Sequence, residues 1–321
     1  LFKGNMNLEL FRKIVRIGGS LLGLCIFLFL VYDGLNKLVK TSTPLEFSWA
    51  FVLLAFALFF LSYLFHMVNY RIIYKSSHQE VSIATTIVGY SFSFLPKYIP
   101  GYIWGYYSRS NWFEEKAKIP NRYSWHASAI ELLVTVLTCS SIWMGYIFTR
   151  NKEFIWIYLI LITPFLAIIP INRCITFFKS YSRTEKWFRN IDTVPYRYWL
   201  IITLISYFQR VLFGIGLWAL SYTFSPTDFI NPQKFLDFTY SFARSWLSGF
   251  LAILIPNGLG VREIVLNELL VEVNNISNNV SVIISTLSRL LMLFAEFGWV
   301  ILAIFMNSKL KKQEYTESII E

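Results

Sequence analysis

The chain has 321 residues, of which 55% are hydrophobic, 19% are aromatic and only 15% are charged. A water-soluble domain cannot cover that much apolar surface, so the composition excludes an ordinary soluble protein and predicts an all-α polytopic membrane protein. The formal net charge of +10 could suggest a nucleic-acid partner, but the positive residues are concentrated in alternate loops between apolar runs. That distribution is typical of membrane topology and predicts no nucleic acid.

Six apolar runs are each close to the ~20 residues that a helix needs to cross the hydrocarbon core of a bilayer. They lie at residues 14–32, 47–68, 125–148, 154–171, 198–222 and 280–306. The first run follows four basic residues and resembles a signal peptide, but no small-x-small cleavage site follows it, so we expect a retained helix. The runs therefore predict six full crossings.

Two further apolar stretches, at residues 81–109 and 242–272, are too interrupted for a comfortable crossing. Their helix-breaking residues are Pro96, Pro100, Gly101 and Gly105 in the first stretch and Pro256, Gly258 and Gly260 in the second. Short hydrophobic segments broken by Pro and Gly in corresponding positions indicate a transporter site. We predict that both stretches are re-entrant helical hairpins and that their breaks lie close together.

The distribution of basic residues predicts the topology. Loops on the side of the N-terminus hold 20 Lys and Arg residues, whereas loops on the other side hold 7. By the positive-inside rule, both termini are expected in the cytoplasm and the protein in the cytoplasmic (inner) membrane. An alternative with eight full crossings also leaves both termini on one side, but it weakens this asymmetry.

The spacing of the elements predicts an inverted-topology repeat. Corresponding helices and breaks in the two halves are offset by 140, 151, 155 and 156 residues, and three crossings per half turn the second half upside down. We therefore expect a first repeat at residues 1–149, a second repeat at 150–306, and a cytoplasmic tail at 307–321.

The breaks predict an anion-binding site. A helix that restarts inside the membrane presents unpaired N–H groups, and the helix dipole makes that end attractive to phosphate or carboxylate. The predicted substrate-binding residues are Pro100, Gly101, Gly105 and Arg109 at the first break, Pro256, Gly258, Gly260, Arg262 and Glu263 at the second, and Arg210 in the helix at 198–222. In the alternative interpretation the glycines only permit close packing, and Arg262 forms an ion pair at a surface.

Ionisable residues inside the predicted crossings form a second group of candidates. They are Glu131, Arg210, Arg289 and Glu296. A charge at bilayer depth costs at least ~2.5–3.5 kcal/mol on insertion scales, so we expect these side chains to face the protein interior and one another. Whether Glu131, Arg289 and Glu296 couple transport to an ion or only form structural ion pairs stays open from the sequence.

The sequence offers no pattern for a metal, a cofactor or a catalytic residue. Its three cysteines and three histidines are scattered, without CxxC or HExxH spacing, and no phosphate-binding loop or GxGxxG fingerprint occurs. We therefore expect no metal site, no cofactor and no enzyme activity.

Four segments resemble the lysylphosphatidylglycerol synthase transmembrane-region family, which includes the flippase domain of the multiple peptide resistance factor and stand-alone relatives. They are "PKYIPGYIWGYYSR", "HASAIELLVTVL", "LAILIPNGLGVREIVL" and "STLSRLLMLFAEFGW". The resemblance implies a lipid translocase and singles out the two break motifs together with Glu131 and Arg289. Two departures, Pro256-Asn257-Gly258 and Glu131-Leu132, leave the identity of the headgroup open. No soluble aminoacyl-transferase domain follows residue 306, so we do not expect the synthase reaction.

The leading hypothesis is a flippase that moves an anionic-headgroup lipid between leaflets, either a polyprenyl-phosphate-linked sugar or an aminoacyl phospholipid or other phospholipid. The alternative is a polyprenyl-phosphate-dependent membrane glycosyl- or phosphotransferase, or an accessory subunit of one. That chemistry usually needs clustered carboxylates, whereas the aspartates here are isolated. The expected partners are a membrane lipid and enzymes of envelope biosynthesis.

Overall fold

The computed structural model describes residues 48–98, 103–150, 154–180, 193–224, 232–252 and 255–320, together with three single positions, 29, 32 and 36. The predicted helix at 14–32 therefore lies outside the described residues, apart from two of its positions. Across the described part of the chain every regular element is a helix, and no strand occurs. The predicted all-α class is confirmed.

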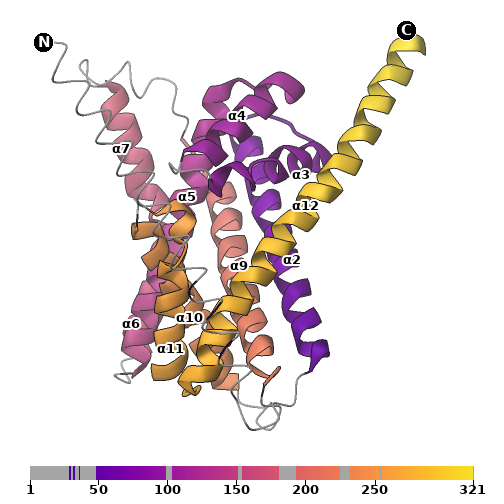
Figure 1. Cartoon of the computed structure of the whole chain (residues 1–321). Coiled ribbons are helices and arrows are strands. Elements are labelled where there is room, and N and C mark those ends of the chain that lie inside the picture. Colours follow the sequence, from indigo (N-terminus) through magenta and orange to yellow (C-terminus); the bar gives the residue numbers. More distant parts are fainter. Residues whose placement is uncertain are drawn as a thin grey trace, which may run out of the picture. The chain divides into compact units, whose positions relative to one another are not determined.

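Five apolar helices are long enough to cross a membrane within the described ranges. They comprise α2 (Trp49–Ser76), α5 (Asn121–Arg150), α6 with α7 (Phe154–Leu166 and Ile168–Ser180), α9 (Tyr196–Ser221) and α12 (Asn278–Ile320) (Figure 1). They coincide with five of the six predicted runs. The chain is thus a multi-pass helical membrane protein.

Several of these helices continue beyond the apolar run that predicted them. In α2 the run ends at Val68, but the helix extends to Ser76 because the next side chains have partners inside the protein. Asn69 Nδ2 donates to Ser206 Oγ at 3.0 Å and to the Ile202 carbonyl at 3.2 Å. A polar side chain that is hydrogen-bonded within the fold does not have to end a membrane helix.

The crossing predicted at 154–171 is divided at Ala167 into α6 and α7. Pro170 explains the break, because it has no N–H to donate to the carbonyl four residues earlier, at Leu166. Pro164 lies inside α6, and its carbonyl accepts a hydrogen bond from Trp199 Nε1 of α9 at 2.8 Å. The Trp199 side chain thus satisfies a backbone carbonyl of the proline-containing turn.

Both interrupted stretches are broken helices. The first contains α3 (Ile83–Ser91), a 3₁₀ turn η1 (Pro96–Tyr98) and α4 (Trp104–Ala117), and the second contains α10 (Pro232–Leu251), a 3₁₀ turn η3 (Pro256–Gly258) and α11 (Val261–Glu272). α10 and α11 pack side by side (Figure 1). α10 begins ten residues before the predicted stretch at 242–272, because its first turns carry polar residues that an apolar pattern leaves out.

The chain forms two compact units by its internal contacts. The first unit comprises residues 1–59, 95–105 and 213–294, and the second comprises 60–94, 106–212 and 295–321. Each unit thus contains segments from both sequence halves. The units and the predicted repeats, 1–149 and 150–306, are different divisions of the chain.

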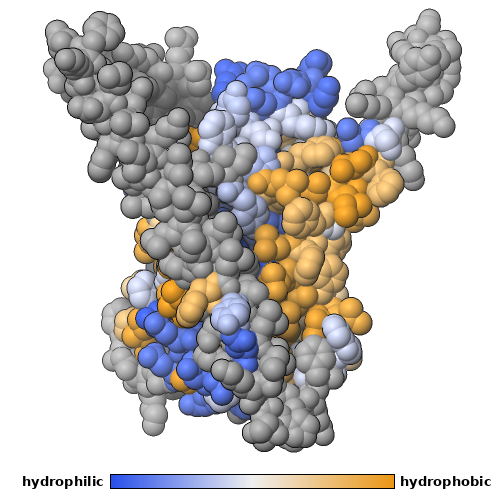
Figure 2. All heavy atoms as spheres, viewed as in Figure 1, coloured by the Kyte–Doolittle hydropathy of each residue, from blue (hydrophilic) through white to orange (hydrophobic). Residues whose placement is uncertain are grey.

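Part of α12 in the second unit exposes a row of large hydrophobic side chains. Phe297, Ile301, Ile304 and Phe305 are each about half exposed or more, and Figure 2 shows hydrophobic residues gathered along this helix. Their spacing of three and four residues places them on one helical face. A continuous apolar stripe of this kind is expected where a helix faces lipid.

Candidate functional site

The two chain breaks meet within the first unit. The turn η1 packs against the turn η3, although they are about half the sequence apart. The Arg289 guanidinium lies 6.0 Å from the ring centre of Tyr98, at the end of η1. The expected proximity of the breaks is therefore confirmed for residues 96–98 and 256–258, whereas Pro100 and Gly101 lie outside the described residues.

This contact predicts a crosslink. In a variant without native cysteines, Lys97→Cys and Asn257→Cys should react with a short bismaleimide in membranes and give an intramolecular product, detected after cleavage of the chain between them. The matched control pairs Lys97→Cys with Asn274→Cys, beyond the far end of α11, which is roughly 18 Å long at 1.5 Å per residue. Equal crosslinking of both pairs would contradict the contact.

The second break is built on glycines that have no room for side chains. Gly258 and Gly260 have φ values of +64° and +83°, which other residues rarely adopt. A Cβ on Gly258 would collide with the backbone of Gly249 in α10, and a Cβ on Gly249 would collide with the Arg262 side chain. Close approach of α10 to the break therefore holds Arg262 in place.

Glu263 ties the restarted helix to α12. One carboxylate oxygen accepts the Gly260 N–H at 2.7 Å, and the other lies 3.3 Å from Arg289 Nε. The Arg289 Nη2 also donates to the Asn257 carbonyl at 3.4 Å. Both ionic side chains are buried, Glu263 to 99% and Arg289 to 95%. Glu263 thus occupies one of the N–H groups that the sequence assigned to a substrate anion.

A cavity lies beside this ion pair, between α10, α11 and α12. It is a small cavity that opens to the outside, and it is lined by Phe242, Ser245, Trp246, Arg262, Glu263, Leu266, Ser285, Ser288, Arg289 and Met292. The Arg262 guanidinium lies 5.4 Å from the Trp246 ring centre. Two arginines and one glutamate give the cavity a formal charge of +1, and the guanidinium groups supply its hydrogen-bond donors, which suits an anion. The three serine hydroxyls each donate to a carbonyl of their own helix.

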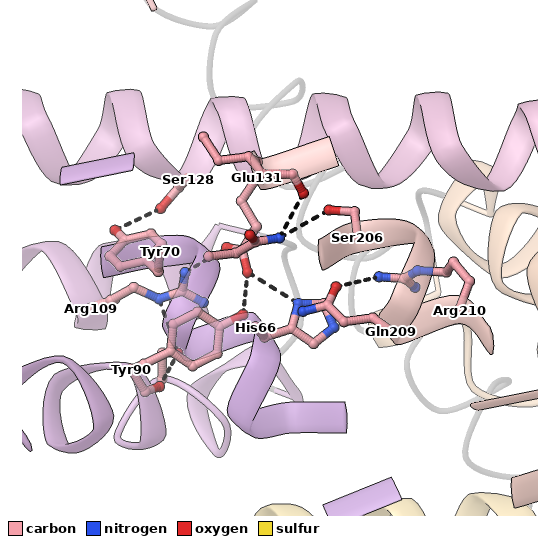
Figure 3. Close-up of polar contacts among 12 residues, drawn as sticks. His66, Tyr70, Tyr90, Arg109, Ser128, Glu131, Ser206, Gln209 and Arg210 are labelled. Carbon is pink, nitrogen blue, oxygen red and sulfur yellow. Dashed lines mark hydrogen bonds and ion pairs between the residues drawn. The ribbon is translucent and has the colours of Figure 1, made fainter. Parts of the chain in front are cut away.

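A second polar cluster surrounds Glu131 in the second unit (Figure 3). Arg109 Nη1 donates to one carboxylate oxygen at 2.8 Å. The other oxygen accepts the Tyr90 hydroxyl and lies 3.4 Å from His66 Nδ1. Four different helices, α2, α3, α4 and α5, supply these side chains. We call His66, Tyr90, Arg109 and Glu131 the Glu131 cluster.

Aromatic rings enclose the cation of this cluster. The Arg109 guanidinium lies 3.7 Å from the ring centre of Tyr90 and 4.6 Å from that of Tyr70. Such contacts stabilise a desolvated guanidinium by about 2 kcal/mol. Burial and the nearby Glu131 charge raise the pKa of Tyr90 well above its ordinary value, so the hydroxyl keeps its proton and remains a donor.

The remaining predicted residues lie elsewhere in the two units. Gly105 is buried near the start of α4. Arg210 is 1% exposed near the middle of α9, and its Nη2 donates to Gln209 Oε1 at 3.4 Å. Glu296 accepts the Tyr63 hydroxyl at 2.5 Å. Arg210 and Glu296 thus belong neither to the cavity lining nor to the Glu131 cluster.

Family models, characterised proteins and solved structures were compared with the chain, and none matches it. The resemblance to the lysylphosphatidylglycerol synthase transmembrane-region family stays a prediction. No group of three or more His, Cys, Asp or Glu side chains that could hold a metal ion occurs in the described ranges.

Sequence reasoning missed several residues of these clusters. His66 was considered only as a metal ligand, although a titratable residue inside an apolar run is itself a signal of function. Tyr63 and Tyr90 carry no such signal, because tyrosine is common in membrane helices. Trp246, Ser285 and Ser288 reach the cavity only through helix packing that spacing along the chain does not reveal.

Proposed function

We propose that this protein is a lipid translocase of the cytoplasmic membrane, and that it moves a lipid with an anionic, phosphate-containing headgroup between leaflets. The observation that carries the proposal is the positively charged cavity beside the second break. A cavity of this composition in a soluble protein could bind many anions. In a multi-pass membrane protein, lipid headgroups are the anions present at the highest local concentration.

Phosphate is the group that best fits the cavity. Arg262 and Arg289 can both donate charge-assisted hydrogen bonds, and the guanidinium fork matches phosphate oxygens. Glu263 offsets one of the two positive charges. A singly charged phosphodiester would neutralise the remainder, whereas a neutral sugar alone would leave a net charge buried, which is costly.

The two broken helices are proposed to be re-entrant hairpins related by an inverted repeat. Each break is followed by a helix whose buried charge pairs with the next long helix: Arg109 with Glu131 after the first break, and Glu263 with Arg289 after the second. The offsets are 154 residues from Arg109 to Glu263 and 158 from Glu131 to Arg289. These values agree with the offsets of the helices. The order of the charges is reversed, because the helix after the break carries the arginine in the first pair and the glutamate in the second.

Glycine contacts support the same correspondence. In α3, Gly89 lies so close to Trp112 and Phe113 of α4 that a Cβ would collide with them. In α10, Gly249 has the same relation to Arg262 of α11. In each broken helix pair, a glycine in the first helix allows the second helix to pack closely against it. This shared feature favours two related copies of one hairpin.

Removing the Arg262 guanidinium tests the proposal. In vesicles that carry a fluorescent phosphatidylglycerol in one leaflet, Arg262→Ala should weaken lipid binding by about 10- to 150-fold, because it removes a charge-assisted contact of roughly 1.5–3 kcal/mol. The expected readout is slower movement of the fluorescent lipid at limiting lipid concentration. Arg262→Lys should recover part of the loss, since it keeps the charge but not the planar fork.

Arg244→Ala is the matched control. Arg244 lies in the same helix pair, on α10, but does not line the cavity and contacts the Tyr240 hydroxyl at 3.1 Å. The control should transport lipid at the wild-type rate. If Arg262→Ala also does so in a protein that melts normally, the cavity is not the headgroup site.

A further inference from the structure

We propose that His66 and Glu131 form a proton-binding site, and that a proton taken up there weakens the bond of Glu131 to Arg109, so that Arg109 can bind an anionic headgroup. The headgroup step rests on the proposed function. The proton step does not, because it depends only on the geometry of the Glu131 cluster in the second unit.

The geometry brings a guanidinium and an imidazole to one carboxylate. Arg109 contacts Oε2 of Glu131 at 2.8 Å, and His66 Nδ1 faces Oε1 at 3.4 Å. A neutral imidazole is a modest partner at that distance, whereas a protonated imidazole makes a charge-assisted hydrogen bond. The His66 and Glu131 side chains are 16% and 10% exposed, so the pair is largely shielded but not sealed from solvent.

Histidine is the side chain suited to exchange a proton near neutral pH, because its ordinary pKa is about 6.5. Glu131 faces His66 directly, and Arg109 binds the same carboxylate. Tyr90 of α3 lies with its ring centre 6.4 Å from the imidazole, and Tyr63, one turn earlier in α2, lies 6.2 Å away.

Two further charged groups come from the neighbouring helices. Tyr63 links the region to Glu296 of α12 through its hydroxyl, and α9 contributes Arg210, which donates to Gln209 (Figure 3). Of these charged groups, Glu131 is the one that pairs with His66, at 3.4 Å. A proton on His66 therefore acts first on the Glu131 carboxylate and, through it, on Arg109.

A proton on His66 and the bond between Arg109 and Glu131 oppose one another. A protonated His66 and Arg109 both bind the Glu131 carboxylate, and the repulsion between their two positive charges is weakly screened in a buried site. By thermodynamic linkage, protonation must weaken the Arg109 bond by the same factor by which that bond weakens protonation. An anion that binds Arg109 should therefore raise the proton affinity of His66, so proton and anionic headgroup bind together.

Histidine NMR tests the proton site directly. The chain has three histidines, so the imidazole signals of ¹⁵N-histidine-labelled protein in phosphatidylcholine nanodiscs can be assigned with His66→Gln. We expect His66 to titrate between about pH 5 and 8. Glu131→Gln should lower its titration midpoint by about one pH unit or more, a tenfold loss of proton affinity, and Arg109→Gln should raise it by a similar amount.

Two controls separate these effects from changes of fold. Arg109→Lys keeps the charge and should leave the midpoint near the wild-type value. His78 is exposed in the turn after α2, and its chemical shifts at a fixed pH should be the same in every variant. The proton site would be overturned if neither Glu131→Gln nor Arg109→Gln changed the titration midpoint of His66. It would also be overturned if His66 did not titrate in this range.

Phosphatidylglycerol added to the nanodiscs tests the headgroup step. The wild-type midpoint of His66 should rise, and the rise should disappear in Arg109→Gln, which experiences the same change of surface potential. If the variants shift the midpoint but phosphatidylglycerol does not, the proton site stands and the lipid function loses support. If lipid moves as proposed but the His66 midpoint is the same in the wild-type protein and in the variants, only the proton site is refuted.

Discussion

Arg109→Met should lower the free energy of unfolding by about 3–5 kcal/mol, because it leaves the Glu131 carboxylate buried without its cation. The Arg109 and Glu131 side chains are 7% and 10% exposed, so water is a poor replacement for the lost partner. Equilibrium unfolding in mixed detergent micelles measures the change. Arg122→Met is the control, since Arg122 is exposed at the start of α5 and should contribute less than about 1 kcal/mol.

The loss should depend on the partner and on pH. Arg109→Met combined with Glu131→Leu removes both charges, and it should recover most of the stability. In Arg109→Met alone, a proton on His66 can compensate the carboxylate. That stabilisation is complete at low pH and is lost as the pH rises through the His66 titration, so the defect should be smaller at pH 5 than at pH 8. A defect that persists in the double variant would mean that packing, not charge, holds α4 in place.

Much of the fold follows from apolar runs, because each described crossing is a separate helix whose backbone is satisfied internally. The ends of the helices follow less well. In α2 the residues after Val68 read as a loop by hydropathy, yet Asn69 and Tyr70 are 3% and 0% exposed. Hydropathy measures transfer of a residue to lipid, whereas these residues are transferred to hydrogen-bond partners inside the protein.

The charged residues of both clusters could be named from the sequence, but their pairing could not. The ionisable residues of the crossings, Arg289 and Glu296 among them, were expected to face one another. In the structure Arg289 pairs with Glu263 of α11, while Glu296 accepts a hydrogen bond from Tyr63. Partners on other helices depend on crossing angles and register, which one sequence does not encode in any local pattern.

Glu263 makes two contacts in the structure that the sequence did not predict. Its place in the second break motif put it among the predicted substrate-binding residues, and that role stays a prediction. In the structure it caps α11 through the Gly260 N–H and offsets Arg289. Under the proposed function, Glu263 would hold the place of the anion when no lipid is bound, and an entering phosphate would compete with it for Arg289.

The competition predicts a stability defect that an anionic lipid repairs. Glu263→Gln keeps the shape of the side chain and an oxygen for the Gly260 N–H, but it leaves the Arg289 charge buried without its carboxylate. The free energy of unfolding should fall by about 3–5 kcal/mol in phosphatidylcholine nanodiscs. Phosphatidylglycerol should stabilise this variant more than it stabilises the wild-type protein, because the phosphate can take the place of the missing carboxylate.

The double variant Glu263→Gln with Arg289→Met separates charge from packing. It carries no unpaired charge from this ion pair, so phosphatidylglycerol should stabilise it no more than wild type. Thermal melting in nanodiscs of the two lipid compositions measures all three proteins. Equal lipid effects on Glu263→Gln and on the double variant would show that no phosphate reaches Arg289. In that event the ion pair is only a link between α11 and α12, and the headgroup must bind elsewhere.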